Sequence, residues 1–571
     1  MMSPKYDLVI RGGTVVDGTG QAMREADVAI EGTRIVAVEK NLGRGKEEID
    51  ARGLLVTPGF VDVHTHFDGQ ATWDERMWPT SQQGVTTAVI GNCGVGFAPC
   101  RPSDRDTLIS LMEGVEDIPG AALHEGLRWD WESFPQYLDA LERRRRDIDI
   151  AALLPHGPLR VYVMGQRAVR REAANASDLA QMQILVRNGL RAGAVGLSTS
   201  RTLAHRDTSG EYTPMFEAAA AELTGLGHTL KGATGAVFQM ISDFDDARAE
   251  FDILRKVCRD SGQAGTVTVL QHDHKPRFHE ELLEMIAEAN AAGERITGQV
   301  ICRPVGVLLG FDTSMNPFSS RSAYAAVAAL PLAQRIAELA RPEVRAAILG
   351  QADYRPNLFM QYYGNAFNRM FPVADQPNYL PDASSSVAAM AMTAGCDPLT
   401  WLYDFFLENR GSSLVYLPLA NYSDGNAEAI ESMLKNSWTV PALGDGGAHV
   451  STICDGSATT FLLTEWVRRR KVFTVEQGIQ MLTQRPAALY AFSDRGTVAP
   501  GMKADLNLID FDALAIDRPY MAYDLPAGGR RFLQGAQGYR ATLVSGQLTY
   551  RDGVPTEALP GKLVRGCYGQ L

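Results

Sequence analysis

Hydrophobic and polar positions alternate in two different ways along the chain. Near the N-terminus, short alternating or apolar runs such as YDLVIRGGTVV and ADVAIEGTRIVAVE are separated by glycines and charged turns, which is typical of β-strands. The C-terminal end shows the same pattern in ADLNLIDFDAL and ATLVSGQLTYRDG. Two β-rich segments at opposite ends of one chain predict a small β-sandwich domain built from both termini, residues 1–58 and 491–571.

Between these ends, apolar runs alternate with amphipathic helix patterns. The apolar runs are GFVDVHTH, TTAVIGN, DIDIAALLP, AVGLSTS, GAVFQMI, TVTVLQ, RITGQVI and WTVPALGD. Eight strands separated by helices favour a (β/α)₈ barrel over an open doubly wound sheet. We therefore expect an α/β fold with a TIM-type barrel over residues 59–490, with polar residues at the strand ends where barrel active sites lie.

One long segment interrupts this alternation. Residues 305–435, between the seventh and eighth expected strands, are rich in proline, tyrosine and phenylalanine. Segments of this length inside a compact domain are usually functional lids or inserted subdomains, so we expect an insertion here.

Composition and charge limit the kinds of partner that the protein is expected to bind. The chain has 571 residues, 45% of them hydrophobic, and its 55 basic and 67 acidic residues give a net charge of −12. This balance argues against a nucleic-acid partner, because phosphate binding needs a basic surface. The sequence shows no apolar span of membrane length and no signal core, and its seven cysteines are scattered, so we expect a cytoplasmic protein with free thiols and no membrane partner. Association into a homo-oligomer stays open.

The stretch VDVHTH holds the first candidate chemistry. Positions two apart in a strand face the same side, so His64 and His66 point the same way, with Asp62 on that face. Burying such polar groups without partners costs free energy, and a metal ion would satisfy them. The alternative is a pair of structural histidines held by hydrogen bonds.

Two further residues with metal-ligand chemistry follow expected strands. Cys93 stands in GNCGVG, where glycines let the backbone bring a thiolate close to an ion, and Asp445 stands in ALGDGG. Zinc takes about four imidazole, thiolate and carboxylate ligands. Because the first and eighth strands of a closed barrel are neighbours, Cys93 and Asp445 can converge with His64 and His66. The alternatives are an inert buried cysteine and a helix-capping or turn aspartate.

The motif VTPGFVDVHTHFDGQ resembles the amidohydrolase superfamily, whose first barrel strand ends in His-x-His after a PGFxDxH lead. GVTTAVIGNCGVGFAPC resembles the N-acyl-D-amino-acid deacylase (D-aminoacylase) branch, in which a cysteine on the second strand is a metal ligand. LLPHGPLR, GAVGLSTS and the closing LPGKLVRG are also similar to that branch, so the resemblance covers most of the chain. It implies an enzyme that binds one or two zinc ions, or another divalent metal, and hydrolyses an N-acyl (D-)amino acid or a related small-molecule amide with a metal-activated water.

The resemblance also assigns roles to individual residues. In amidohydrolases the aspartate at the end of the eighth strand takes a proton from the attacking water and passes it to the leaving group, which is the role implied for Asp445. His156 and Arg160 match the third-strand motif and are expected to line the substrate pocket, with a structural strand-end histidine as the alternative. For His449, substrate contact and simple packing both stay open.

Three strands depart from the family pattern. On the fifth strand the branch carries a histidine in Thr-His-x-Arg, whereas this chain has VFQMISDF, with Gln239 or Met240. On the sixth, where the family has Ser-His-x-Lys, LQHDHKP offers His272 as a ligand after one inserted residue, whereas Asp273 stands at the position without an insertion. Lys275 there is either an anchor for a substrate carboxylate or a solvated loop lysine.

The aspartate-and-tyrosine motif of the seventh strand is missing from GQVICRPVG. These departures keep two other functions open. One is hydrolysis of a cyclic amide or another carboxamide. The other is a catalytically inactive barrel that acts as a binding or assembly module.

Overall fold

Each of the eight apolar runs forms a β-strand in the computed structural model of the chain, which describes residues 5–351, 358–453 and 455–569. One parallel sheet has the order β6 (Phe60–Asp62), β7 (Val85–Ile90), β8 (Asp149–Ala152). The other has the order β18 (Thr439–Pro441), β14 (Ile296–Val300), β13 (Ala264–Thr268), β12 (Val237–Ser242), β10 (Gly196–Arg201), β9 (Leu154–Pro155). The predicted α/β class is confirmed.

The third run contributes to both sheets, because β8 and β9 are separated only by Leu153. The backbone N–H of Leu153 donates to Ile90 at the end of β7, 2.9 Å away, while Val195, just before β10, donates to Ala152 over the same distance. This one segment therefore connects the two sheets.

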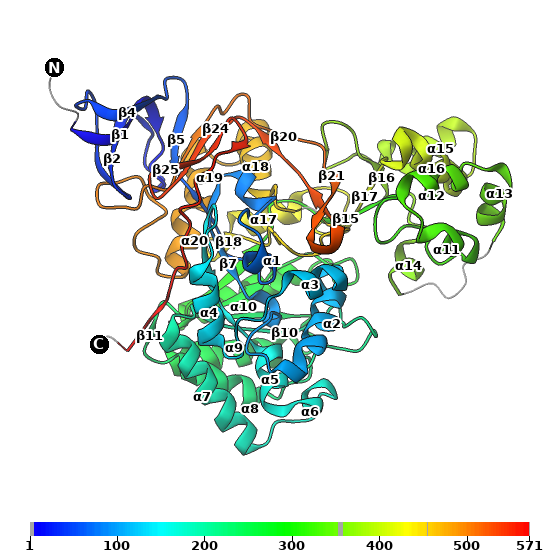
Figure 1. The fold of residues 1–571 in the computed structure, drawn as a ribbon, viewed down its shortest axis with the longest axis horizontal. Helices are drawn as coiled ribbons and strands as arrows, with labels where there is room; N and C mark the ends of the chain where they lie inside the picture. The colour runs from blue at the N-terminus through cyan, green and yellow to red at the C-terminus, as the bar shows by residue number, and fades with distance from the viewer. Residues whose placement is uncertain (1–4, 352–357, 454, 570–571) are drawn as a thin grey trace.

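Helices lie between the strands (Figure 1). The main ones are α2 (Arg105–Glu116), α4 (Phe134–Arg143), α7 (Ala176–Ala192), α9 (Ala247–Ser261), α10 (Phe278–Ala291), α17 (Glu428–Lys435) and α19 (Val475–Leu482). Helix α7 shows why they form where they do. Asn175 caps its first turn by accepting hydrogen bonds from the backbone of Ser177 and Asp178, and Gly193 ends it with φ +113°.

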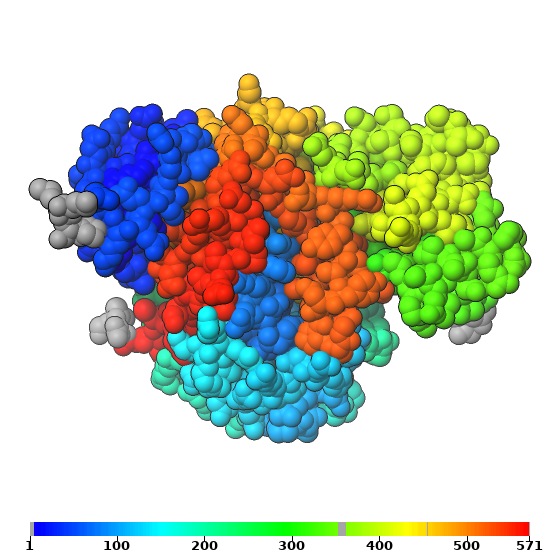
Figure 2. Space-filling view, turned by 45° about the horizontal axis from the view of Figure 1, so that its top comes forward, coloured from blue at the N-terminus to red at the C-terminus, as the bar shows by residue number. Residues whose placement is uncertain are grey.

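The two ends of the chain share one nine-stranded sheet. Its strands are β1 (Tyr6–Val15), β2 (Arg24–Glu31), β3 (Arg34–Glu39), β4 (Gly45–Asp50), β5 (Leu55–Pro58), β19 (Leu506–Ile509), β24 (Tyr539–Val544), β25 (Gln547–Arg551) and β26 (Val554–Pro555). Antiparallel pairing of β5 with β19 joins the N-terminal and C-terminal strands. Figure 2 shows the blue and the orange-red segments side by side.

Most of residues 305–435 form a separate lobe, green to yellow in Figure 1. It contains a sheet of β15 (Val305–Leu309), β17 (Val415–Ala420) and β16 (Phe371–Pro372) and the helices α11 (Ser322–Ala328), α12 (Leu332–Leu339), α13 (Pro342–Gly350), α14 (Leu358–Tyr363), α15 (Val387–Ala394) and α16 (Pro398–Leu407). Phe311, Phe318, Tyr403 and Phe406 pack together in a hydrophobic cluster of its own. An inserted unit with its own core explains the aromatic richness of the segment.

A C-terminal hairpin, β21 (Tyr520–Leu525) and β22 (Gly529–Leu533), reaches back over the strand ends. The backbone N–H of Phe532 donates to Val450 O, 2.6 Å away, in the loop after β18. The Tyr523 hydroxyl bonds to Asp312 of the inserted lobe. Within the described ranges, no helix has both the length and the apolar character needed to cross a membrane.

Candidate metal centre

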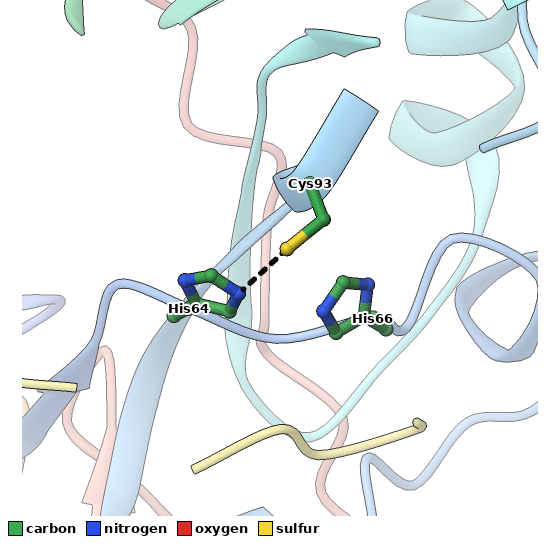
Figure 3. A group of neighbouring side chains, drawn as sticks. All are labelled: His64, His66 and Cys93. Atoms are coloured by element: carbon green, nitrogen blue, oxygen red, sulfur yellow. Dashed lines mark hydrogen bonds between the residues drawn. The ribbon is translucent and has the colours of Figure 1, made fainter. Parts of the chain in front are cut away.

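Four predicted ligands meet at the ends of β6, β7 and β18. His64 Nε2 lies 3.3 Å from Cys93 Sγ and 3.7 Å from Asp445 Oδ1, and His66 Nε2 lies 3.8 Å from the same Asp445 oxygen. Figure 3 shows the two rings and the thiol turned toward one another. Four ligands around a tetrahedral zinc ion are about 3.3–3.6 Å apart, given bond lengths of about 2.0–2.3 Å. The observed spacing therefore suits one cation.

The centre is buried on all sides except one. His64, His66 and Cys93 are 1%, 3% and 4% exposed, whereas the Asp445 side chain is 19% exposed. Asp445 Oδ1, which faces both rings, is buried and accepts no hydrogen bond. Among the residues that the structure describes, His64, His66 and Cys93 are the one group of three such side chains with ligand atoms all within 4.8 Å of each other. Donor chemistry and the orphaned oxygen both fit a divalent metal.

The turn that carries Cys93 is held in an unusual conformation. Cys93 has φ +54°, a region that L-residues rarely adopt, and the turn is preceded by Gly91 with φ +78°. A Cβ at Gly91 would lie 2.3 Å from the backbone oxygen of Leu153, so glycine is required there. The Cys93 N–H donates to Gln239 Oε1, 2.8 Å away. Such over-determined strained residues cluster at functional sites.

The loop after β18 also contains residues with positive φ. Asp445 and His449 have φ +42° and +46°. Asp445 N–H donates to His64 O over 3.2 Å, and His66 N–H donates to Gly446 O over 2.8 Å. Gly444 leaves room for Asp62, since a Cβ there would lie 2.4 Å from the Asp62 carboxylate. These bonds place the ends of the first and eighth strands together, as the sequence predicts.

The Nδ1 atoms of both imidazoles face oxygens, with a hydrogen bond at His64 and a close carboxylate contact without hydrogen-bond geometry at His66. His64 Nδ1 lies 2.6 Å from Gln299 Oε1, and His66 Nδ1 lies 3.1 Å from Glu116 Oε1 at the end of α2. Gln299 Oε1 accepts from His64, which favours a protonated Nδ1 on that ring and leaves its Nε2 free to bind a metal. Glu116 is 1% exposed, and its other oxygen lies 3.9 Å from His449 Nε2. Sequence reasoning missed Gln299 and Glu116, because no local motif marks them.

Burial moves the ionisable groups of the centre toward their neutral forms. It lowers the pKa of His64 to about 4 and the pKa of His66 well below its usual range. It raises the pKa values of the Cys93 thiol and the Glu116 and Asp445 carboxyls well above theirs. Neutral imidazole is the metal-binding form, whereas thiolate and carboxylate need a positive charge nearby in such surroundings. A divalent cation would supply that charge.

His205 is a second residue of this region that sequence reasoning missed. It follows β10, is 9% exposed, and its Nδ1 lies 2.9 Å from Ser200 Oγ. Burial lowers its pKa to about 3, with further lowering by His449 and His64. A lone histidine in a loop carries no pattern that would reveal this proximity.

His156 and Arg160 form a buried cluster with Glu222. His156 Nε2 lies 2.9 Å from Glu222 Oε1, its Nδ1 lies 3.0 Å from Thr199 Oγ1, and the Arg160 guanidinium pairs with the same carboxylate. His156 and Arg160 are 0% and 1% exposed. The structure therefore places both in a structural ion pair, which leaves neither ring nitrogen of His156 free for a substrate.

The QHDH segment lies apart from the ligand group. His272 stands four residues beyond the end of β13 and forms isolated β-bridges with Ala420 and Lys275. Its ring packs against His274, with centroids 5.5 Å apart. Lys275 Nζ donates to the backbone oxygens of Asp243 and Phe244. The predicted metal ligand and carboxylate anchor are thus both engaged in loop contacts, because β13 ends at Thr268 and both residues lie in the loop that follows.

The space next to the centre is small. A cavity of about 20 Å³ is lined by Asp445, Gly446, Trp78, Arg531 and Phe532, among others. This volume suits one water molecule but no larger ligand. Arg531 and Phe532 of the hairpin β21–β22 line this cavity together with Asp445.

The family described as "Amidohydrolase family" matches residues 47–550. The chain belongs to the amidohydrolase family. The predicted resemblance is confirmed.

This amidohydrolase is 28% identical to N-acyl-D-glutamate deacylase of Alcaligenes xylosoxydans xylosoxydans over 570 residues, which cover 99% of the chain and 97% of that relative. Its fold is similar to a D-aminoacylase solved to study the role of its binuclear metal centre, with a TM-score of 0.66, 22% identity, and coverage of 98% of this chain and 100% of the other. It is also similar to N-acyl-D-glutamate deacylase from Bordetella bronchiseptica, complexed with zinc and a phosphonate inhibitor, with a TM-score of 0.62, 23% identity and the same coverage.

Proposed function

We propose that the chain is a metal-dependent amidohydrolase that cleaves the amide bond of N-acyl amino acids, including the D form. The observation that carries the proposal is the convergence of His64 Nε2, His66 Nε2, Cys93 Sγ and Asp445 Oδ1. A catalytically inactive binding module has no need of four buried donors in this arrangement. Similarity to an N-acyl-D-glutamate deacylase along almost its whole length supports the substrate class.

The proposal includes the architecture that builds the centre. The two parallel sheets form one closed eight-stranded barrel within residues 59–490, joined through Leu153 on one side and through the hydrogen bonds between the His64–His66 and Asp445–Gly446 loops on the other. Residues 1–58 and 491–571 form the small β-sandwich domain, and residues 305–435 are an insertion in the barrel. Active sites of such barrels lie at the carboxyl ends of the strands.

The four donors hold zinc or another divalent cation in this proposal. A zinc ion bound there would supply Lewis acidity, which lowers the pKa of water and polarises an acyl carbonyl. Asp445 takes the proton of the attacking water and returns it to the leaving amine. It is suited to this role because it is the most exposed of the four and lines the cavity.

We assign different roles to the other residues predicted to contact the substrate. His449 follows Asp445 and keeps a 30% exposed side chain, which supports a substrate contact. We assign His156 and Arg160 to holding the third strand end through Glu222, and Lys275 to its loop. The substrate enters after the hairpin β21–β22 moves, since the present cavity is too small for it.

Asp445→Asn tests the mechanism. The variant should lower kcat on N-acetyl amino acids by roughly 10²–10⁴-fold, the range expected for loss of a general acid–base group. Asp375→Asn is the matched control, since this aspartate side chain is 100% exposed. Unchanged turnover in Asp445→Asn would exclude the mechanism. If the unmodified enzyme hydrolysed neither the D nor the L form of an N-acetyl amino acid but did hydrolyse a cyclic amide, the proposed substrate class would be wrong.

A further inference from the structure

The strands opposite the ligands carry a layer of polar side chains inside the barrel. Ser198 on β10, Gln239 on β12, Thr266 on β13 and Gln299 on β14 are all 0% exposed. The strand register pairs Ser198 with Gln239 and Gln239 with Thr266, so these three lie side by side. Gln299 joins the layer by donating from Nε2 to Thr266 Oγ1, 3.2 Å away. Four buried polar residues in one layer need a purpose, because burial without partners is costly.

Two members of the layer bind the turn that presents the thiol. Gln239 Oε1 accepts from the Cys93 N–H at 2.8 Å, and Ser198 Oγ accepts from the Gly94 N–H at 3.0 Å. These bonds fix the backbone of Cys93 in its positive-φ conformation. The fifth strand therefore contributes to the centre by holding a ligand that another strand supplies.

Gln239 also occupies the strand on which the deacylase branch carries a histidine ligand. Its oxygen is already used by Cys93, and the remaining amide nitrogen, buried without a hydrogen-bond partner, is a donor that cannot bind a cation. Zinc in proteins takes imidazole, thiolate or carboxylate ligands. This position therefore supplies no ligand for a second ion.

The sixth and seventh strands supply none either. Thr268 ends β13, and the nearest histidine, His272, lies four residues further on and contacts Ala420. On β14, Gln299 Oε1 is used at 2.6 Å to orient His64 Nδ1. The Gln239 amide on β12 thus stands where the family has a ligand, and the Gln299 amide on β14 holds the ligand His64.

From this arrangement we infer that the centre holds one cation and not two, with Gln239 and Gln299 as positioning residues that keep Cys93 and His64 in place. The inference rests on the metal centre proposed above. Four donors complete the usual zinc set. It separates this chain from the structurally similar D-aminoacylase, whose metal centre is binuclear.

The test is metal stoichiometry, which needs no substrate. The full-length protein, stripped by a chelator under reducing conditions, is dialysed to equilibrium against excess Co²⁺ and, separately, Zn²⁺, and bound metal is measured by mass spectrometry. We expect one equivalent, and a thiolate-to-cobalt absorption band that is lost in Cys93→Ser. Cys258→Ser is the matched control, since this free cysteine is also buried but lies outside the ligand group.

Two variants of Gln299 test its positioning role, with His272→Ala as the comparison. Gln299→Leu should weaken Co²⁺ binding by roughly 10–100-fold while the stoichiometry stays at one, as expected for loss of a group that orients a ligand. Gln299→Glu keeps the acceptor and should restore most of the affinity. His272→Ala should change neither value. An unchanged affinity in Gln299→Leu would refute its positioning role.

The outcomes separate this inference from the proposed function. Two tightly bound equivalents, or loss of one equivalent in His272→Ala, would overturn the single-cation inference and leave the hydrolase proposal intact. One equivalent without amide turnover would support the inference and overturn the function. Absence of any bound metal would overturn both.

Discussion

The strand ends around the centre fall into two groups with different chemistry. The ends of β6, β7 and β18 supply the imidazoles, the thiol and the carboxylate, whereas β10, β12 and β14 supply a hydroxyl and two amides that bond to His64 and to the turn of Cys93. Apart from Asp445, both groups are deeply buried, so burial alone does not distinguish them. The difference shows that different strands can supply the ligands and the residues that hold them, so substitutions in the two groups should have separate effects on metal content and on affinity or stability.

Removing a ligand should have the largest effect. His66→Ala takes away one of the two imidazoles that face Asp445 Oδ1. We expect bound metal to fall far below one equivalent and kcat to fall on the order of 10³-fold, which is about 4 kcal/mol in the activation barrier. Metal analysis and steady-state kinetics provide the measurement, with the exposed His228→Ala as control. Full metal content in His66→Ala would place this histidine among the supports.

Breaking the His156–Arg160–Glu222 cluster should reduce stability and not metal content. Glu222→Gln leaves the buried Arg160 guanidinium without its charge partner, which typically costs about 3–5 kcal/mol. Denaturant unfolding measures this loss, and the exposed Glu217→Gln is the control. If Glu222→Gln lost bound metal without a loss in unfolding free energy, the cluster would contribute to metal binding and not to stability.

The comparison also shows how far the sequence alone leads. All eight strands and the four converging donors follow from local signals: apolar runs that end in His-x-His, and glycines beside Cys93 and Asp445 that allow close approach. The supports are different. Gln299 reaches His64 across 235 positions of the chain, and Glu116 is one of many acidic residues at helix ends, so only tertiary structure selects them.

The two expectations that the geometry does not support have the same origin. The QHDH segment has the spacing of a metal pair, but β13 ends at Thr268 and leaves His272 beyond the strand end. His156 and Arg160 match a pocket motif, yet their acidic partner Glu222 lies 62 or more positions away. A motif indicates which residue types are present, whereas strand length and distant partners decide what those residues contact.

The strained turn before Cys93 offers a smaller and more local test. Gly91→Ala adds a methyl group 2.3 Å from Leu153 O at a positive φ. We expect a loss of about 1–3 kcal/mol in unfolding free energy and weaker metal binding. Gly210→Ala is the matched control, since it has φ +85° and nothing within 4 Å of the added carbon. Equal losses in both variants would show that close approach at Gly91 does not matter.

The smallest expected effect is a pH dependence of stability that comes from the buried His156. Burial lowers the pKa of His156, although Glu222 opposes the shift. Because the folded-state pKa is below the unfolded value of about 6.5, the unfolded chain binds the extra proton, and stability falls as pH drops below about 6.5. His156→Asn should remove a slope of at most about 1.4 kcal/mol per pH unit. Identical slopes in the parent and the variant would contradict this, and the exposed His228→Asn is the control.

The central claim is that imidazoles after β6, a thiolate after β7 and a carboxylate after β18 share one cation. Zinc-edge X-ray absorption on the metal-loaded protein tests it directly. We predict one sulfur neighbour at about 2.3 Å, nitrogen and oxygen neighbours at about 2.0–2.2 Å, and loss of the sulfur in Cys93→Ser. A spectrum without a sulfur neighbour, or with a second metal nearby, would contradict the account.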